Sequence, residues 1–132
     1  MYRERISHIP LFAGLSDREL RTLAQRAEQV SVPKGTTVVT EGATGVEFFL
    51  LVSGTAKVTR GGRTVRKLGP GDSFGELALI AGTPRRATVT TTDACVLMVL
   101  VRRDFIALLE EFPRMARKML VGLAAWVADR AD

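Results

Sequence analysis

Cysteine and histidine are nearly absent from this chain, with one residue of each among 132. A single cysteine cannot form an intrachain disulfide, and Cys95 lies in an apolar run that is typical of a buried core thiol. The one histidine, His8, has no partner at metal-ligand spacing. The usual acid–base and metal chemistry is therefore excluded, and we expect no catalytic residues, no metal, no cofactor and no enzyme activity.

Long apolar runs and blocks of like charge are also missing. The longest apolar run is far shorter than the ~20 residues of a membrane span, and no basic-then-apolar leader is present. The net charge is +5, but the arginines are spread along the chain without interleaved aromatic residues. We therefore expect a single domain, residues 1–132, in a reducing cytoplasm, with no membrane or nucleic-acid contact.

Residues 1–28 are predicted to form an N-terminal helical segment. Ser16 and Glu19 make an S-x-x-E capping box, which marks the start of a helix. Apolar residues then recur at helical spacing: Leu20, Leu23, Ala24 and Ala27. The short apolar segment 9–12 ahead of the box is expected to pack against the core.

Residues 29–101 have the pattern of a β domain. Short β-branched or aromatic runs are separated by glycines at about 8–12 residues, as in sandwiches and small barrels. Gly61 and Gly62 between two such runs indicate a two-residue hairpin turn. The predicted strands are 36–40, 48–52, 55–60, 63–68, 87–91 and 95–101.

Residues 102–132 return to a helical pattern. Pro113 is predicted to end one helix and to occupy the first position of the next. The first helix has one expected buried face: Phe105, Leu108, Leu109 and Phe112. The second has an apolar stripe: Met115, Met119, Gly122, Leu123 and Trp126.

The most informative stretch is 74–80, which is followed closely by Arg85. Gly75 allows the backbone to approach a ligand, and the free N–H groups that open a short helix point at an anion. Arg85 can bind a phosphate through paired, charge-assisted hydrogen bonds. The Glu76 carboxylate can only accept, so it suits a sugar hydroxyl. Together these groups could hold a small phosphorylated sugar.

This stretch, Phe-Gly-Glu-Leu-Ala followed by Pro-Arg-x-Ala-Thr-Val, resembles the phosphate-binding cassette of cyclic nucleotide-binding domains. That family includes the regulatory subunits of cyclic-AMP-dependent kinase, the catabolite activator proteins and the cyclic-nucleotide-gated channels. The glycines that punctuate the β region match the family as well: Gly42, Gly45, Gly54, Gly71 and Gly75. The resemblance covers essentially the whole chain.

The resemblance implies an α+β, mainly β, fold. We expect an antiparallel, jelly-roll-like β-roll at 29–101 that contains the cassette at 74–89. An N-terminal helix precedes it at 1–28, and two C-terminal helices, which act as hinge and lid, follow at 102–132.

The resemblance also implies a role for each cassette residue. Arg85 would bind the cyclic phosphate, and Glu76 would accept a hydrogen bond from the ribose 2′-hydroxyl and also steady Arg85. Main-chain groups of neighbouring residues would make further contacts: Gly75, Leu77, Ala78, Arg86 and Ala87.

Residues outside the cassette would enclose the base. Val58 and Val65, on either side of the hairpin turn, would be apolar walls, although core packing explains both equally well. The final helix would form a lid, with Trp126 and Arg130 as the residues over the base. At this spacing Trp126 is also compatible with the core or with a dimer contact.

Two positions depart from the family pattern. Arg86 stands where relatives usually have a small or hydroxylated residue, and a hydroxyl there tends to favour guanine. Without that hydroxyl, cyclic AMP is favoured over cyclic GMP. Val46 replaces the acidic residue that commonly follows the loop glycine, and this change is expected to affect the turn more than the pocket.

We therefore predict a cyclic nucleotide sensor that transmits ligand occupancy through its C-terminal helices. A homodimer through the last helix and a protein effector are further candidate partners. Two alternatives stay open: a sensor fragment of a catabolite-activator-type transcription regulator or another larger effector, and a degenerate domain used only for protein contacts. A cupin-type enzyme is excluded because the chain has no histidine cluster.

Overall fold

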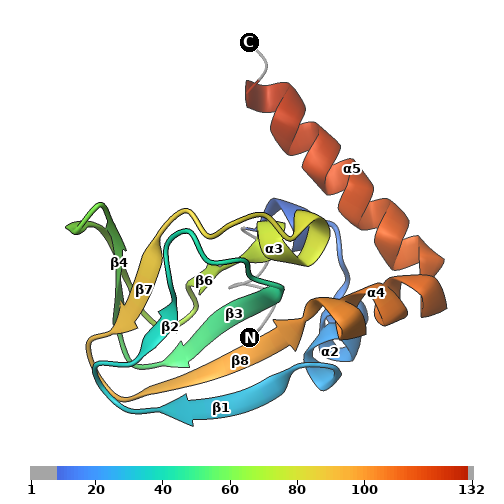
Figure 1. Ribbon diagram of the computed structural model, residues 1–132. Coiled ribbons are helices and arrows are strands. Elements are labelled where there is room, and N and C mark those ends of the chain that lie inside the picture. The colour runs from blue at the N-terminus through green and yellow to red at the C-terminus, as the bar shows by residue number, and fades with distance from the viewer. Residues whose placement is uncertain (1–8, 131–132) are drawn as a thin grey trace. The chain divides into compact units, whose positions relative to one another are not determined.

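The computed structural model describes residues 9–130, and Figure 1 shows the course of its strands and helices. The chain divides into two compact units. Residues 27–102 form a β unit, and the segments before and after them form a helical unit. His8 lies outside the described residues.

The β unit consists of two antiparallel sheets and one short helix. The first sheet has the strand order β1-β8-β3-β6 and the second β2-β7-β4-β5. The bounds are β1 (Glu28–Val32), β2 (Thr37–Val39), β3 (Glu47–Ser53), β4 (Ala56–Arg60), β5 (Arg63–Leu68), β6 (Ser73–Phe74), α3 (Glu76–Ala81), β7 (Thr88–Thr91) and β8 (Cys95–Val101). The predicted β-roll with an N-terminal helix and two C-terminal helices is thereby confirmed.

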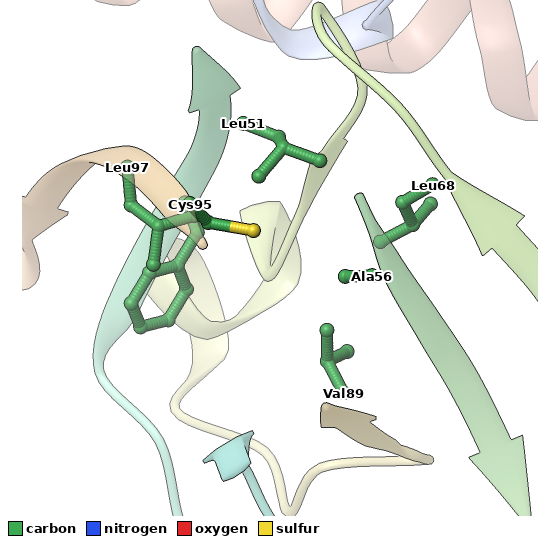
Figure 2. Packing of buried hydrophobic residues seen from close by; sticks show 7 residues of the cluster. Leu51, Ala56, Leu68, Val89, Cys95 and Leu97 are labelled. Carbon is green, nitrogen blue, oxygen red and sulfur yellow. The ribbon is translucent and has the colours of Figure 1, made fainter. Parts of the chain in front are cut away.

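The two sheets share one apolar core, which is shown in Figure 2. Leu51, Cys95 and Leu97 come from the first sheet, and Ala56, Leu68 and Val89 come from the second. Cys95 is the buried core thiol that the sequence predicted, and its Sγ lies 3.2 Å from the carbonyl oxygen of Thr55. Burial raises the pKa of this thiol above its ordinary value.

The predicted strands are found with small differences at their ends. The hairpin strands β4 and β5 are joined by Gly61 and Gly62, whose φ angles of 58° and 80° suit the expected tight turn. Strands β1 and β6 were not predicted: β1 begins at Glu28, the last residue of the segment predicted to be helical, and β6 has only two residues, too few to show an alternating pattern. The pairing of β6 with β3, which places Phe74 opposite Phe49, fixes the start of the cassette.

In the part of the chain that the structure describes, the first elements of the helical unit are η1 (Pro10–Phe12) and α2 (Asp17–Gln25). The capping box is present as predicted. The Glu19 N–H donates to Ser16 Oγ at 3.2 Å, and the Ser16 N–H donates to Glu19 Oε1 at 2.9 Å. The buried residues of these two elements include Leu11, Phe12, Leu20 and Leu23.

The C-terminal segment forms α4 (Arg102–Glu111) and α5 (Pro113–Arg130), so Pro113 separates two helices as predicted. Phe105 and Leu108 are buried, but the expectation for Phe112 is wrong, since it is 37% exposed. Phe112 lies between the end of α4 and Pro113, and its N–H still donates to the Leu108 carbonyl oxygen at 2.9 Å, so its backbone position continues the helix although its side chain is not buried. Within residues 9–130, no helix has the length and apolar character that a membrane span requires.

Candidate functional site

The β unit contains a cavity of about 410 Å³ that opens beside α3. Residues from the β4–β5 hairpin, from the β6–α3 segment and from the loop before β7 contribute to its walls. The lining residues are Val39, Val58, Arg60, Val65, Arg66, Leu68, Ser73, Phe74, Gly75, Glu76, Ala78, Thr83, Pro84, Arg85, Arg86, Ala87 and Val89.

Gly75 turns the chain from β6 into α3. Its φ of 90° is left-handed, a conformation that glycine adopts without strain. A Cβ at this position would lie 2.6 Å from Arg85 Nη1 and 2.6 Å from the Glu47 carbonyl oxygen. The missing side chain therefore lets the Arg85 guanidinium approach the backbone that opens α3.

Arg85 is fixed from several sides. Its side chain is only 8% exposed, and Nη2 donates to the carbonyl oxygen of Glu47 at 3.0 Å. The guanidinium carbon lies 5.8 Å from the centre of the Phe49 ring, which in turn stacks on Phe74 at 4.9 Å. The Arg85 main-chain N–H donates to the carbonyl oxygen of Ala43 at 2.8 Å, so the backbone of this residue is fixed as well as its side chain.

The electrostatics of the cavity favour an anion. Burial lowers the pKa of Arg85, while the Glu47 carboxylate, 3.7 Å from Nη2, acts in the opposite direction. Arginine keeps its charge under such shifts. The described lining residues include one carboxylate, that of Glu76, and four arginines: Arg60, Arg66, Arg85 and Arg86.

One expectation about Arg85 needs correction. We expected Glu76 to steady its guanidinium, but within residues 9–130 its carboxylate partner is Glu47, and Glu76 makes no ion pair with it. Glu47 is the first residue of β3, so the carboxylate beside Arg85 comes from outside the cassette.

The structure brings most of the predicted ligand residues together at this cavity. Its walls include Val58, Val65, Gly75, Glu76, Ala78, Arg85, Arg86 and Ala87. Leu77 lies in the first turn of α3. Val58 lines the cavity and also packs against the core, and its contact with a base stays a prediction.

The two lid candidates belong to the other unit. Trp126 and Arg130 lie near the end of α5, and the guanidinium carbon of Arg130 is 4.1 Å from the centre of the Trp126 ring. Trp126 is 38% exposed, so the core interpretation of this residue is wrong for the single chain.

Sequence reasoning missed Arg60 and Arg66 in the hairpin wall. Arg60 Nε donates to the carbonyl oxygen of Arg86 at 3.1 Å, and Arg66 Nη2 lies 3.8 Å from Asp72. Strand alternation would have placed Arg60 on the same face as Val58. Val65 is the extra residue of a β-bulge, which explains why adjacent residues 65 and 66 both reach the cavity.

The cavity combines cationic and apolar side chains, a lining that suits an anion with an apolar part. Within residues 9–130, no group of three or more histidine, cysteine, aspartate or glutamate side chains could hold a metal ion. A buried guanidinium, the open end of a short helix and a nearby carboxylate suit a phosphate that is attached to a hydroxylated sugar.

The family model of the cyclic nucleotide-binding domain matches residues 29–112. The chain belongs to this family. Among curated proteins it is 36% identical over 127 residues to the cAMP-dependent protein kinase regulatory subunit of Yarrowia lipolytica. That match covers 96% of this chain and 34% of the relative. It is 32% identical to the Cyclic AMP receptor protein of Thermus thermophilus, over 87% of this chain and 56% of the relative.

Solved structures of similar proteins also match this chain. The N-terminal domain of a transcriptional regulator from Streptomyces coelicolor A3(2) is similar at a TM-score of 0.88 and 28% identity, over 96% of this chain and 94% of that one. The regulatory domain of Toxoplasma gondii PKA, solved with cAMP, is similar at a TM-score of 0.68 and 34% identity, over 80% of this chain and 44% of that one. The domain thus spans only part of the kinase subunits and of the receptor protein that it resembles.

Proposed function

We propose that this domain binds a 3′,5′-cyclic nucleotide in the cavity, with cyclic AMP favoured over cyclic GMP, and that it acts as a sensor and not as an enzyme. The observation that carries the proposal is the buried Arg85 guanidinium beside the N-terminal turn of α3. The relatives whose names or structures mention cAMP support the choice of ligand.

In this proposal the phosphate lies between Arg85 and the first amides of α3. The Ala78 N–H already donates to the Gly75 carbonyl oxygen at 3.1 Å, so the Glu76 and Leu77 amides are the better donors. The Glu76 carboxylate takes the ribose 2′-hydroxyl, and Val58 and Val65 contact the base.

Ligand occupancy would be transmitted through the C-terminal helices. A ligand can shift these helices between two states only by the difference in its affinity for them. Trp126 and Arg130 are the proposed lid residues. The exposed apolar residues Leu120, Val121 and Val127 on α5 favour a homodimer through this helix.

The proposal is tested by titration calorimetry with cyclic AMP and cyclic GMP. Removing one partner of a buried charge pair costs ~2–5 kcal/mol, so Arg85→Ala should bind roughly thirty- to several-thousand-fold more weakly. Arg21→Ala, which removes the same charge from an exposed site on α2, is the matched control and should bind as wild type does. Wild-type affinity in Arg85→Ala would contradict the assignment.

A second candidate is that the chain is the sensor part of a larger regulator. The similarity to the N-terminal domain of the Streptomyces coelicolor transcriptional regulator favours it, as does the partial coverage of the other relatives. A chain that binds neither nucleotide would instead support a degenerate domain used for protein contacts.

A further inference from the structure

Gly45 lies directly behind the guanidinium of Arg85, although the sequence pattern gave it only the role of a turn glycine. It is buried, and a Cβ built on it would collide with Nε, Cζ and Nη2 of Arg85. The φ of Gly45 is not left-handed, in contrast to that of Gly75. An alanine at residue 45 therefore fills the space behind Arg85 without imposing an unfavourable backbone conformation.

The guanidinium has little freedom to avoid such a methyl group. Nη2 is held by the Glu47 carbonyl oxygen, Nη1 lies beside Gly75, and the Phe49 ring lies 5.8 Å from Cζ. Because Arg85 also lines the cavity, the open direction is into the space that the ligand would occupy. An added methyl group at residue 45 would push the cation toward that space and out of its hydrogen bond.

We propose that Gly45 is a positioning residue of the ligand site: the absence of a side chain there sets the depth at which the Arg85 guanidinium lies, and through it the affinity for the cyclic phosphate. The inference rests on the proposed function. Inserting a methyl group into a well-packed region costs about 1–3 kcal/mol. If this cost falls on the arrangement of Arg85 that binds the phosphate, affinity drops by roughly five- to a hundred-fold.

The test compares wild type with Gly45→Ala, Arg85→Ala and the double variant. Cyclic AMP affinity is measured by calorimetry, and stability without ligand is measured by urea unfolding. Gly69→Ala is the matched control, because Gly69 is not left-handed either and its added Cβ meets nothing within 4 Å. Gly45→Ala should bind cyclic AMP roughly five- to a hundred-fold more weakly, and Gly69→Ala should stay within about twofold of wild type.

The unfolding data test the contact itself. Gly45→Ala should lower the urea midpoint of the ligand-free protein, and most of this loss should disappear when Arg85 is also alanine, because the colliding group is gone. If Gly45→Ala alone does not fold, recovery of a cooperative transition in the double variant supports the contact, and failure to recover overturns it.

Two results would overturn the inference in different ways. Wild-type affinity in Gly45→Ala, or equal losses of stability with and without Arg85, would contradict the positioning role alone. A wild-type chain that binds no cyclic nucleotide overturns the proposed function, and with it the ligand role of Gly45, even if the two substitutions remain coupled in stability.

Discussion

Replacement of Arg85 by lysine separates the charge of this residue from its shape. The guanidinium uses Nη2 to donate to the Glu47 carbonyl oxygen at 3.0 Å, while Nη1 lies at the Gly75 backbone where α3 begins. A lysine has one nitrogen at the end of a flexible chain, so it cannot hold the Glu47 carbonyl and bind two phosphate oxygens together. The positive charge of the site is unchanged.

The expected loss follows from the hydrogen bonds that lysine cannot make. One hydrogen bond to a charged group contributes ~1.5–3 kcal/mol, so Arg85→Lys should bind cyclic AMP roughly ten- to a hundred-fold more weakly than wild type. It should still bind more tightly than Arg85→Ala, because the charge remains.

Calorimetry on the three proteins, with Arg21→Lys on α2 as the control for the same exchange at an exposed site, gives the ranking. Urea unfolding of each variant establishes that it is folded before affinities are compared. Equal affinity of Arg85→Lys and wild type would refute the reasoning, because it would show that charge alone accounts for the contribution of Arg85.

Three further predictions concern other groups. Wild type should bind 2′-deoxy cyclic AMP roughly tenfold more weakly than cyclic AMP, and Glu76→Ala should not distinguish the two; no preference in wild type would contradict the ribose role. Thr91 is 2% exposed and its hydroxyl bonds two backbone groups at 2.8 Å, so Thr91→Val should lower the free energy of urea unfolding by about 1–3 kcal/mol, and a neutral result would be inconsistent with those bonds. Burial alone would raise the pKa of Glu19, but hydrogen bonds from Lys118 and Ser16 outweigh burial and lower this pKa. The stability that ionised Glu19 contributes is therefore present above its unfolded-state pKa and is lost as the pH falls through its folded-state pKa. As the pH falls from about 5 to 3, Glu19→Gln should therefore lose less free energy of unfolding than wild type. Equal losses in the two proteins would argue against the Glu19–Lys118 ion pair.

Much of the fold follows from local sequence signals. The capping box at Ser16, the glycine pair of the β4–β5 hairpin and the helix break at Pro113 each act over a few residues, and all three are found in the structure. The errors occur where local patterns are weakest. Strand β6 has two residues, and its existence depends on pairing with β3, which lies far from it in the sequence.

The site could be predicted in part for a similar reason. The cassette is contiguous, so its residues could be recognised together on one short stretch. Gly45 and Glu47 lie about forty residues earlier, and their place behind Arg85 results from the way the start of β3 meets the loop before β7. No spacing rule in the sequence connects these positions, and the contribution of Glu47 became visible only from side-chain geometry.

The most direct test of the proposed binding mode is a crystal structure of the domain, from crystals grown or soaked with cyclic AMP. We predict the nucleotide in the 410 Å³ cavity, with its phosphate oxygens within hydrogen-bond distance of the Arg85 guanidinium and its 2′-hydroxyl on Glu76. An empty cavity at saturating nucleotide, or a nucleotide bound elsewhere with Arg85 unchanged, would contradict the claim that this arginine holds a cyclic phosphate.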